Sequence, residues 1–167
     1  MAASSDSLVF VTTTPDDPRA LPLIEELSRE YDERYEPNDG VPSSFELQRY
    51  PAELFTETEG GTFVLLLDGT VAVAGGAFIR VTERTVEVKR VWTASTHRRR
   101  GLARLVMAEL ERAAAIRGYA HVELTTGARQ PEAVGLYLSL GYQPQFDLDG
   151  DLEAISYLRF TKDLAVA

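Results

Sequence analysis

The chain has 167 residues, of which 44% are hydrophobic and 26% are charged, so it suits one globular domain with a substantial core. Its net charge of -9 argues against general nucleic-acid binding, which needs an extended basic surface. The chain has no cysteine, which excludes disulfides and thiolate chemistry, and His97 and His121 are too few and too far apart for a histidine-rich metal site. We expect a cytoplasmic protein, because the N-terminus lacks the build of a signal peptide and no apolar run approaches the roughly 20 residues that span a bilayer.

The first third of the chain predicts one strand and two helices. Residues 8–13 are a β-branched and aromatic run that is typical of a strand. A helix is predicted between Pro18 and Pro37, because apolar residues recur there at helical spacing. Its apolar positions are Leu23, Ile24, Leu27 and Tyr31, and its opposite face carries Glu25, Glu26, Arg29 and Glu30. Residues 43–54 predict a second, shorter helix that Pro51 interrupts.

The middle of the chain predicts an antiparallel meander of three strands. Residues 62–67 and 70–79 flank Asp68-Gly69, a dipeptide that supplies the positive φ angles of a two-residue hairpin turn. The glycine pair at residues 75–76 indicates a bulge or a close backbone approach within the second strand. A turn then leads into the third strand, at residues 85–93.

Three adjacent arginines follow this third strand. A helix N-terminus carries about half a positive charge, so Arg98, Arg99 and Arg100 should repel it unless an anion normally binds there. Gly101 lets a ligand approach the backbone, and Ala103 keeps the first helical turn small. An apolar stripe should pack this helix on the sheet, formed by Leu102, Val106, Leu110 and Ala113 with Leu105 beside it. The alternative is a run of solvated loop charges, which the strand–loop–helix context disfavours.

The remainder predicts a strand, a helix and a last strand. Residues 121–126 form the strand, and its connection through the central helix implies parallel pairing within one sheet. Gln130-Pro131 starts the next helix, since proline suits the first helical position. The last strand is predicted at residues 154–161, paired with a short strand around residues 142–146. The chain therefore reads as a single α+β domain.

Two motifs carry a family resemblance. RRRGLA at residues 98–103 is similar to the R/Q-x-x-G-x-G/A signature of the GNAT superfamily of acetyl-CoA-dependent N-acetyltransferases. EAVGLYLSLGY at residues 132–142 resembles the A-x-x-L-Y-x-x-x-G-Y/F helix of the same superfamily. The resemblance implies a GNAT-like α+β fold, with a mixed, mostly antiparallel sheet of six to seven strands flanked by about four helices. The sheet would splay near its middle.

The resemblance also implies that acetyl-CoA binds in this splay as co-substrate, with no metal. Backbone amides around Arg99 to Arg104 would bind its pyrophosphate. Backbone groups of the strand at residues 91–93 would pair with the pantetheine arm, as an added strand does. Gln130 stands where the family often has asparagine. The cofactor-binding candidates are Val91, Trp92, Thr93, Arg98, Arg99, Arg100, Gly101, Leu102, Ala103, Arg104 and Gln130.

Acetyl transfer to an amine needs a base for the ammonium, whose pKa is about 10, and a proton for the departing thiolate. Tyr137 is the candidate acid, because it matches the tyrosine position of the family; the alternative is a tyrosine packed by its ring. Glu87 is the candidate base, on the strand that would bear the cofactor. Its alternative is an ion pair with Lys89 or Arg90. A backbone N–H of this strand would stabilise the oxyanion.

The sequence therefore predicts transfer of an acetyl group from acetyl-CoA to a primary amine of a small-molecule or amino-acid-like acceptor. The alternatives are a protein lysine or N-terminal acetyltransferase, and a non-catalytic acyl-CoA-binding regulator. Tyr31, Tyr35 and Tyr50 lie in the region that would cover the acceptor site. No nucleic-acid or membrane partner is expected, and the resemblance allows a homodimer.

Overall fold

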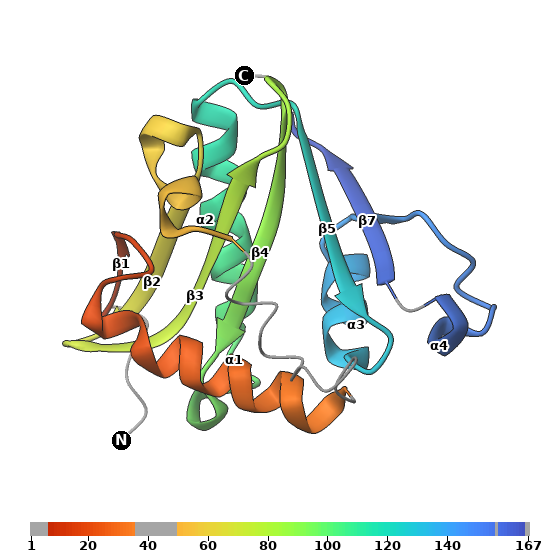
Figure 1. Cartoon of the computed structure of the whole chain (residues 1–167), viewed down its shortest axis with the longest axis horizontal. Coiled ribbons are helices and arrows are strands. Elements are labelled where there is room, and N and C mark those ends of the chain that lie inside the picture. Colours follow the sequence, from red (N-terminus) through yellow and green to blue (C-terminus); the bar gives the residue numbers. More distant parts are fainter. Residues whose placement is uncertain (1–6, 36–49, 156, 166–167) are drawn as a thin grey trace.

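The computed structural model describes residues 7–35, 50–155 and 157–165, and its described strands form one mixed sheet in the order β1-β2-β3-β4-β5-β7-β6 (Figure 1). The strands are β1 (Leu8–Thr12), β2 (Thr62–Asp68), β3 (Val71–Arg80), β4 (Thr85–Thr93), β5 (His121–Gly127), β6 (Gln143–Pro144) and β7 (Tyr157–Asp163). The α-helices of this part are α1 (Leu21–Arg34), α2 (Leu102–Ile116), α3 (Pro131–Ser139) and α4 (Leu152–Ile155). The predicted mixed α+β fold is confirmed.

The sheet opens between its two central strands. β4 and β5 are the parallel pair, and their pairing covers Thr85 to Glu87 against His121 to Glu123. β4 continues to Thr93 and β5 to Gly127 beyond that pairing, and Figure 1 shows the two strands diverging there. We call the region between the two diverging strands the splay. Its existence agrees with the resemblance and follows from the end of the β4–β5 ladder at Glu87.

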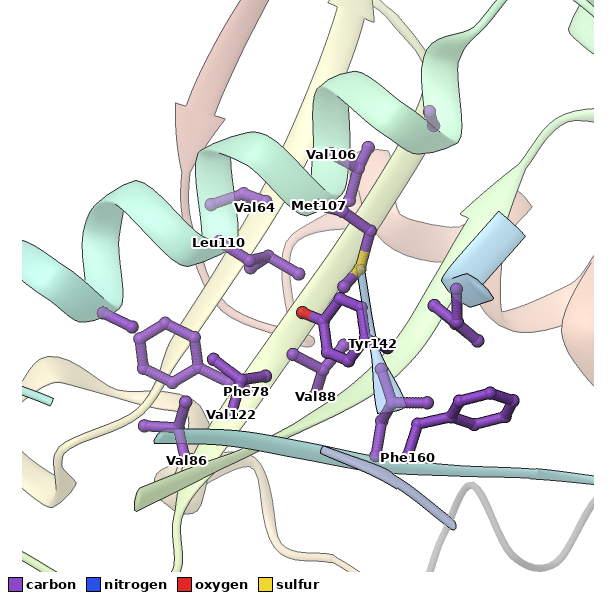
Figure 2. Close-up of a cluster of buried hydrophobic side chains, with 14 of the residues drawn as sticks. Val64, Phe78, Val86, Val88, Val106, Met107, Leu110, Val122, Tyr142 and Phe160 are labelled. Atoms are coloured by element: carbon purple, nitrogen blue, oxygen red, sulfur yellow. The ribbon is translucent and has the colours of Figure 1, made fainter. Parts of the chain in front are cut away.

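Each face of the sheet carries its own hydrophobic core. On one face, Val86 and Val88 of β4 pack with the buried stripe of α2 (Figure 2). That stripe consists of Leu102, Val106, Met107, Leu110 and Ala114. The prediction that Leu105 lies beside the stripe was wrong: its side chain is 44% exposed, because it falls outside the arc centred on Val106 and Leu110. On the other face, Leu23 and Leu27 of α1 pack with core residues of β2, β3 and β4.

A bulge in β4 changes which face its side chains meet. The β3–β4 register shifts between Gly75 and Ala77, and Arg90 on the facing strand has a φ of 59°. Val88 before the bulge belongs to the α2-side core, whereas Trp92 after it belongs to the α1-side core. A side chain at Gly76 would place its Cβ 2.8 Å from Val106 Cγ1. The close approach predicted at the glycine pair is therefore present, and the bulge lies opposite this pair, in β4.

The structure corrects two predicted element boundaries. Asp68 pairs with Val71, so the β2–β3 loop consists of Gly69 and Thr70 and begins one residue later than predicted. The last strand does not begin at Ala154. Residues 152–155 form α4, because both the carbonyl and the carboxylate of Asp151 accept a hydrogen bond from the Ala154 amide.

The predicted helix at residues 43–54 lies largely outside the described residues. Its described end contributes to a 3-10 helix, η4 (Ala52–Phe55). The described residues also form the 3-10 helices η2 (Pro18–Ala20), η5 (Glu57–Glu59) and η6 (Ser95–His97). Among the helices of the described ranges, none has the length and apolar character needed to cross a membrane.

Candidate functional site

The N-terminus of α2 leaves its amides available to a ligand. Gly101 is the N-cap with a φ of 74°, no side chain caps the helix, and no acidic residue lies in its first turn. The Leu105 amide donates to the Gly101 carbonyl at 3.3 Å, so the amides of residues 102–104 precede the first intrahelical acceptor. A Cβ built on Gly101 would meet no atom within 4 Å. This end of α2 therefore fits an anionic group approaching the backbone.

The three arginines before this helix are not equivalent. The Arg98 guanidinium forms an ion pair with Glu30 of α1 and lies 3.6 Å from a carboxylate oxygen of Glu26. Arg99 and Arg100 are exposed, and Arg99 has a φ of 66°, a left-handed conformation that is uncommon for arginine. The side chain of Arg98 is thus directed at α1, whereas the other two lie at the surface beside the end of α2.

Arg104 and Gln130 make contacts that bring α2, β5 and α3 together. The Arg104 guanidinium donates to Ser139 Oγ at 2.6 Å, at the end of α3. Gln130 precedes α3, and its Oε1 accepts a hydrogen bond from Thr126 Oγ1 at 2.7 Å. The side-chain oxygen of Gln130 therefore already has a partner on β5. Helix α3 begins at the next residue, close to the end of that strand.

The strand segment predicted to pair with the pantetheine arm lies in the splay. Trp92 and Thr93 pair with Gly75 and Ala74 of β3, so one edge of the segment is occupied. Its other edge faces β5 beyond the last parallel pair at Glu87. An unpaired strand edge of this kind can hydrogen-bond to an amide-bearing ligand. The segment from Val91 to Thr93 therefore fits the predicted use of its backbone groups.

The candidate base lies on the face of β4 that α1 covers. Glu87 Oε1 is 2.6 Å from Lys89 Nζ, and the two side chains are 23% and 15% exposed. The same Lys89 Nζ lies 4.0 Å above the ring of Tyr50. Arg90 stacks on Phe55 at 4.6 Å, and burial lowers its pKa. The alternative contact predicted for Glu87, an ion pair with Lys89, is therefore present.

The candidate acid lies on the opposite face of the sheet, in the α2-side core. Tyr137 of α3 is 7% exposed, and its ring packs 5.8 Å from Tyr142 and 5.7 Å from Phe160. Burial raises the pKa of Tyr137 well above its ordinary value, and the phenol of Tyr31 on α1 adds a smaller upward effect. Glu87 and Tyr137 thus lie on opposite faces of the sheet.

Sequence reasoning missed how α1 joins both sides of the splay. At its C-terminal end, the Tyr35 hydroxyl lies 1.7 Å from where a Cβ of Gly127 would stand, so this glycine makes room for the tyrosine. Arg34 forms an ion pair with Glu132 of α3, and the Arg129 guanidinium donates to the Arg34 carbonyl at 2.8 Å. Figure 1 shows α1 running from β3 toward the end of β5. Gly127, at the end of β5, was the sequence signal for the contact with Tyr35.

Comparison with known proteins identifies the family. The model of the acetyltransferase (GNAT) family matches residues 20–142. The chain belongs to this family. The match includes α1, the loop before α2 and the α3 motif, which are the parts that form the candidate site. A search of curated proteins found no match.

Solved structures share the GNAT fold at low sequence identity. A GNAT-family acetyltransferase from Staphylococcus aureus has 15% identity and a TM-score of 0.72, covering 95% of this chain and 99% of its own. A Salmonella typhimurium protein solved with its cofactor acetyl-CoA has 17% identity and a TM-score of 0.66, with 96% of each chain covered. The ribosomal-protein-S18-alanine N-acetyltransferase of Escherichia coli has 16% identity and a TM-score of 0.64, again with 96% of each chain covered.

Proposed function

We propose that this GNAT protein transfers the acetyl group of acetyl-CoA to a primary amine of a small-molecule or amino-acid-like acceptor. The observation that carries the proposal is the uncapped N-terminus of α2 beside a sheet that opens after Glu87. An anion-binding helix end and an unpaired strand edge suit the two ends of one ligand, a pyrophosphate and an amide-bearing arm. The GNAT family match supports the same co-substrate.

The cofactor-binding residues divide into two groups in this proposal. Amides from Arg99 to Arg104, including those of Gly101, Leu102 and Ala103, would bind the pyrophosphate, and Arg98 to Arg100 would offset its charge. Backbone groups from Val91 to Thr93 would bind the pantetheine arm, with Gln130 on the far side of the splay. Bound in this way, acetyl-CoA supplies the acetyl group as a thioester.

The chemistry requires a base for the acceptor amine and stabilisation of the departing thiolate. The acceptor nitrogen attacks the thioester carbonyl carbon, the C–N bond forms, and the C–S bond breaks. We assign Glu87 to take the proton from the amine, directly or through water, and Tyr137 to donate a hydrogen bond to the departing sulfur. Because its pKa is raised, Tyr137 stays protonated at neutral pH, and full transfer to a thiolate whose conjugate acid has a pKa of about 8.5 is uphill. Its contribution is therefore stabilisation of the sulfur anion.

A screen of amines, amino acids and peptides with acetyl-CoA tests this function, with thiol release as the readout. The proposal predicts acetyl-CoA-dependent release with at least one small primary amine, and mass spectrometry should show the acetylated amine. Release with peptides alone would assign a protein acceptor instead. Binding of CoA without release for any acceptor would assign a regulator that has lost the chemistry.

A further inference from the structure

The loop between β4 and α2 is held by carboxylates of α1. Glu26 Oε1 accepts a hydrogen bond from the backbone amide of Ser95 at 2.7 Å. Arg98, three residues further along the loop, forms an ion pair with Glu30 and approaches Glu26 at 3.6 Å. The Glu26 and Glu30 side chains are 18% and 23% exposed, so both contacts are partly shielded from water.

The helix that carries these carboxylates is fixed against the sheet. Leu23 is fully buried and Leu27 is 5% exposed, and both belong to the α1-side core. A Cβ on Gly75 of β3 would lie 2.9 Å from Leu23 Cδ1, which shows how closely the helix approaches the strand. Glu26 is therefore presented to the loop by a rigid element, the arrangement that a preorganised site needs.

The loop conformation requires support from outside the loop. Arg99 and Gly101 both have left-handed backbone angles, with φ values of 66° and 74°. Such an angle costs a non-glycine residue free energy and persists where surrounding contacts hold it. The bond to Ser95 and the Arg98 ion pair are contacts of this kind, on the N-terminal side of Arg99.

The carboxylates of Glu26 and Glu30 would repel a pyrophosphate bound nearby, so their position calls for a structural role that offsets this repulsion. We propose that Glu26 is a positioning residue for the cofactor: its bond to Ser95, together with the Glu30–Arg98 pair, fixes the β4–α2 loop so that the amides of Arg99 to Arg104 face the pyrophosphate. This inference rests on the proposed function. It makes α1, the helix that borders the acceptor side, a structural part of the cofactor site.

Calorimetric titration with CoA tests the role of Glu26. Glu26→Ala should weaken CoA binding on the order of tenfold, the factor that a charge-assisted hydrogen bond typically contributes. Glu26→Gln keeps an oxygen that accepts from Ser95 and should retain affinity close to that of the unchanged protein. Glu25→Ala, which removes an exposed carboxylate on the same helix, is the matched control and should leave affinity unchanged.

A second variant removes the other partner of the same bond. Ser95→Pro deletes the donor amide at the first position of η6, where proline suits the backbone, and should weaken CoA binding about as much as Glu26→Ala. Pantetheine, which lacks the pyrophosphate, should bind each variant as tightly as it binds the unchanged protein. Unchanged or tighter CoA binding by both variants, or an equal loss of pantetheine binding, would overturn the inference. Absence of CoA binding by the unchanged protein would instead refute the proposed function.

Discussion

Lys89 Nζ lies 2.6 Å from Glu87 Oε1, on the face of β4 that α1 covers and beside the point where the pairing of β4 with β5 ends. The carboxylate proposed as the base therefore has a fixed cationic neighbour on its own strand. An ion pair of this kind orients the carboxylate, and it is also what a purely structural strand residue would show. The two roles differ in what they predict for the rate of acetyl transfer.

Glu87→Gln should lower kcat for acetyl transfer by roughly a hundredfold or more, the usual contribution of a positioned general base. The dissociation constant for CoA should stay unchanged, because the side chain is not assigned to the cofactor. Steady-state kinetics with an acceptor from the screen, combined with calorimetry, measures both. Glu123→Gln is the control, since Glu123 lies opposite Glu87 on β5 and pairs with Arg159 at 2.8 Å. Full activity of Glu87→Gln with a lowered melting temperature would make Glu87 structural.

Tyr137→Phe should lower kcat without weakening CoA binding, because it removes the hydroxyl proposed to stabilise the sulfur and keeps the ring. We expect a loss of roughly tenfold to a hundredfold, the lower end of general-acid effects, since the raised pKa limits proton transfer. Tyr142→Phe is the matched control, because its ring lies in the same core and its hydroxyl bonds to Glu111 at 3.2 Å. Equal kinetics for the two variants would leave Tyr137 as a packing residue.

The protein should lose stability in alkaline solution. Burial raises the pKa of both Tyr137 and Tyr142 above the ordinary value of 10.0. Above about pH 10 the unfolded chain releases these protons while the folded chain keeps them, so the unfolding free energy falls as pH rises. Urea denaturation between pH 8 and 11 measures the slope. Tyr137→Phe and Tyr142→Phe should each make the slope shallower, and an unaltered slope in both variants would contradict the burial argument.

Glu111 should contribute more to stability than Glu109 on the same helix, whose partner Arg112 is exposed. It bonds Lys162 Nζ at 2.7 Å and the Tyr142 hydroxyl at 3.2 Å, which connects α2 to β7 and to the end of α3. Glu111→Ala should lower the unfolding free energy by about 1–3 kcal/mol, because two partly buried polar groups lose a partner. Glu109→Ala, which breaks a pair with the exposed Arg112, should cost about 0–1 kcal/mol. Equal losses of unfolding free energy in the two variants would show that the contacts of Glu111 with Lys162 and Tyr142 add no stability.

Much of the fold could be predicted because local chemistry determined it. The glycine pair in β3 and the proline at the start of α3 each fix a feature within a few residues. The errors arose where several local signals competed. Asp68-Gly69 marked the hairpin, but the loop itself moved to Gly69 and Thr70 because Asp68 remained in the ladder with Val71.

The candidate site was less accessible to sequence reasoning, because its contacts join residues far apart in the chain. Three identical arginines could not be told apart until α1 placed Glu30 beside Arg98. Glu26 belonged to the polar face of a predicted helix, and its bond to an amide 69 residues away required the packing of α1 on the sheet. Local pattern located the loop, and tertiary packing determined what each of its residues contacts.

Thermal unfolding with and without acetyl-CoA tests the central claim most directly. A ligand that binds only the folded state stabilises it by about 4 kcal/mol at a thousandfold excess over its dissociation constant, so millimolar acetyl-CoA should raise the melting temperature by several degrees. Replacing Arg98, Arg99 and Arg100 together with glutamine should reduce that rise. An unchanged melting temperature at millimolar acetyl-CoA would contradict the assignment of the α2 N-terminus and the splay as its binding site.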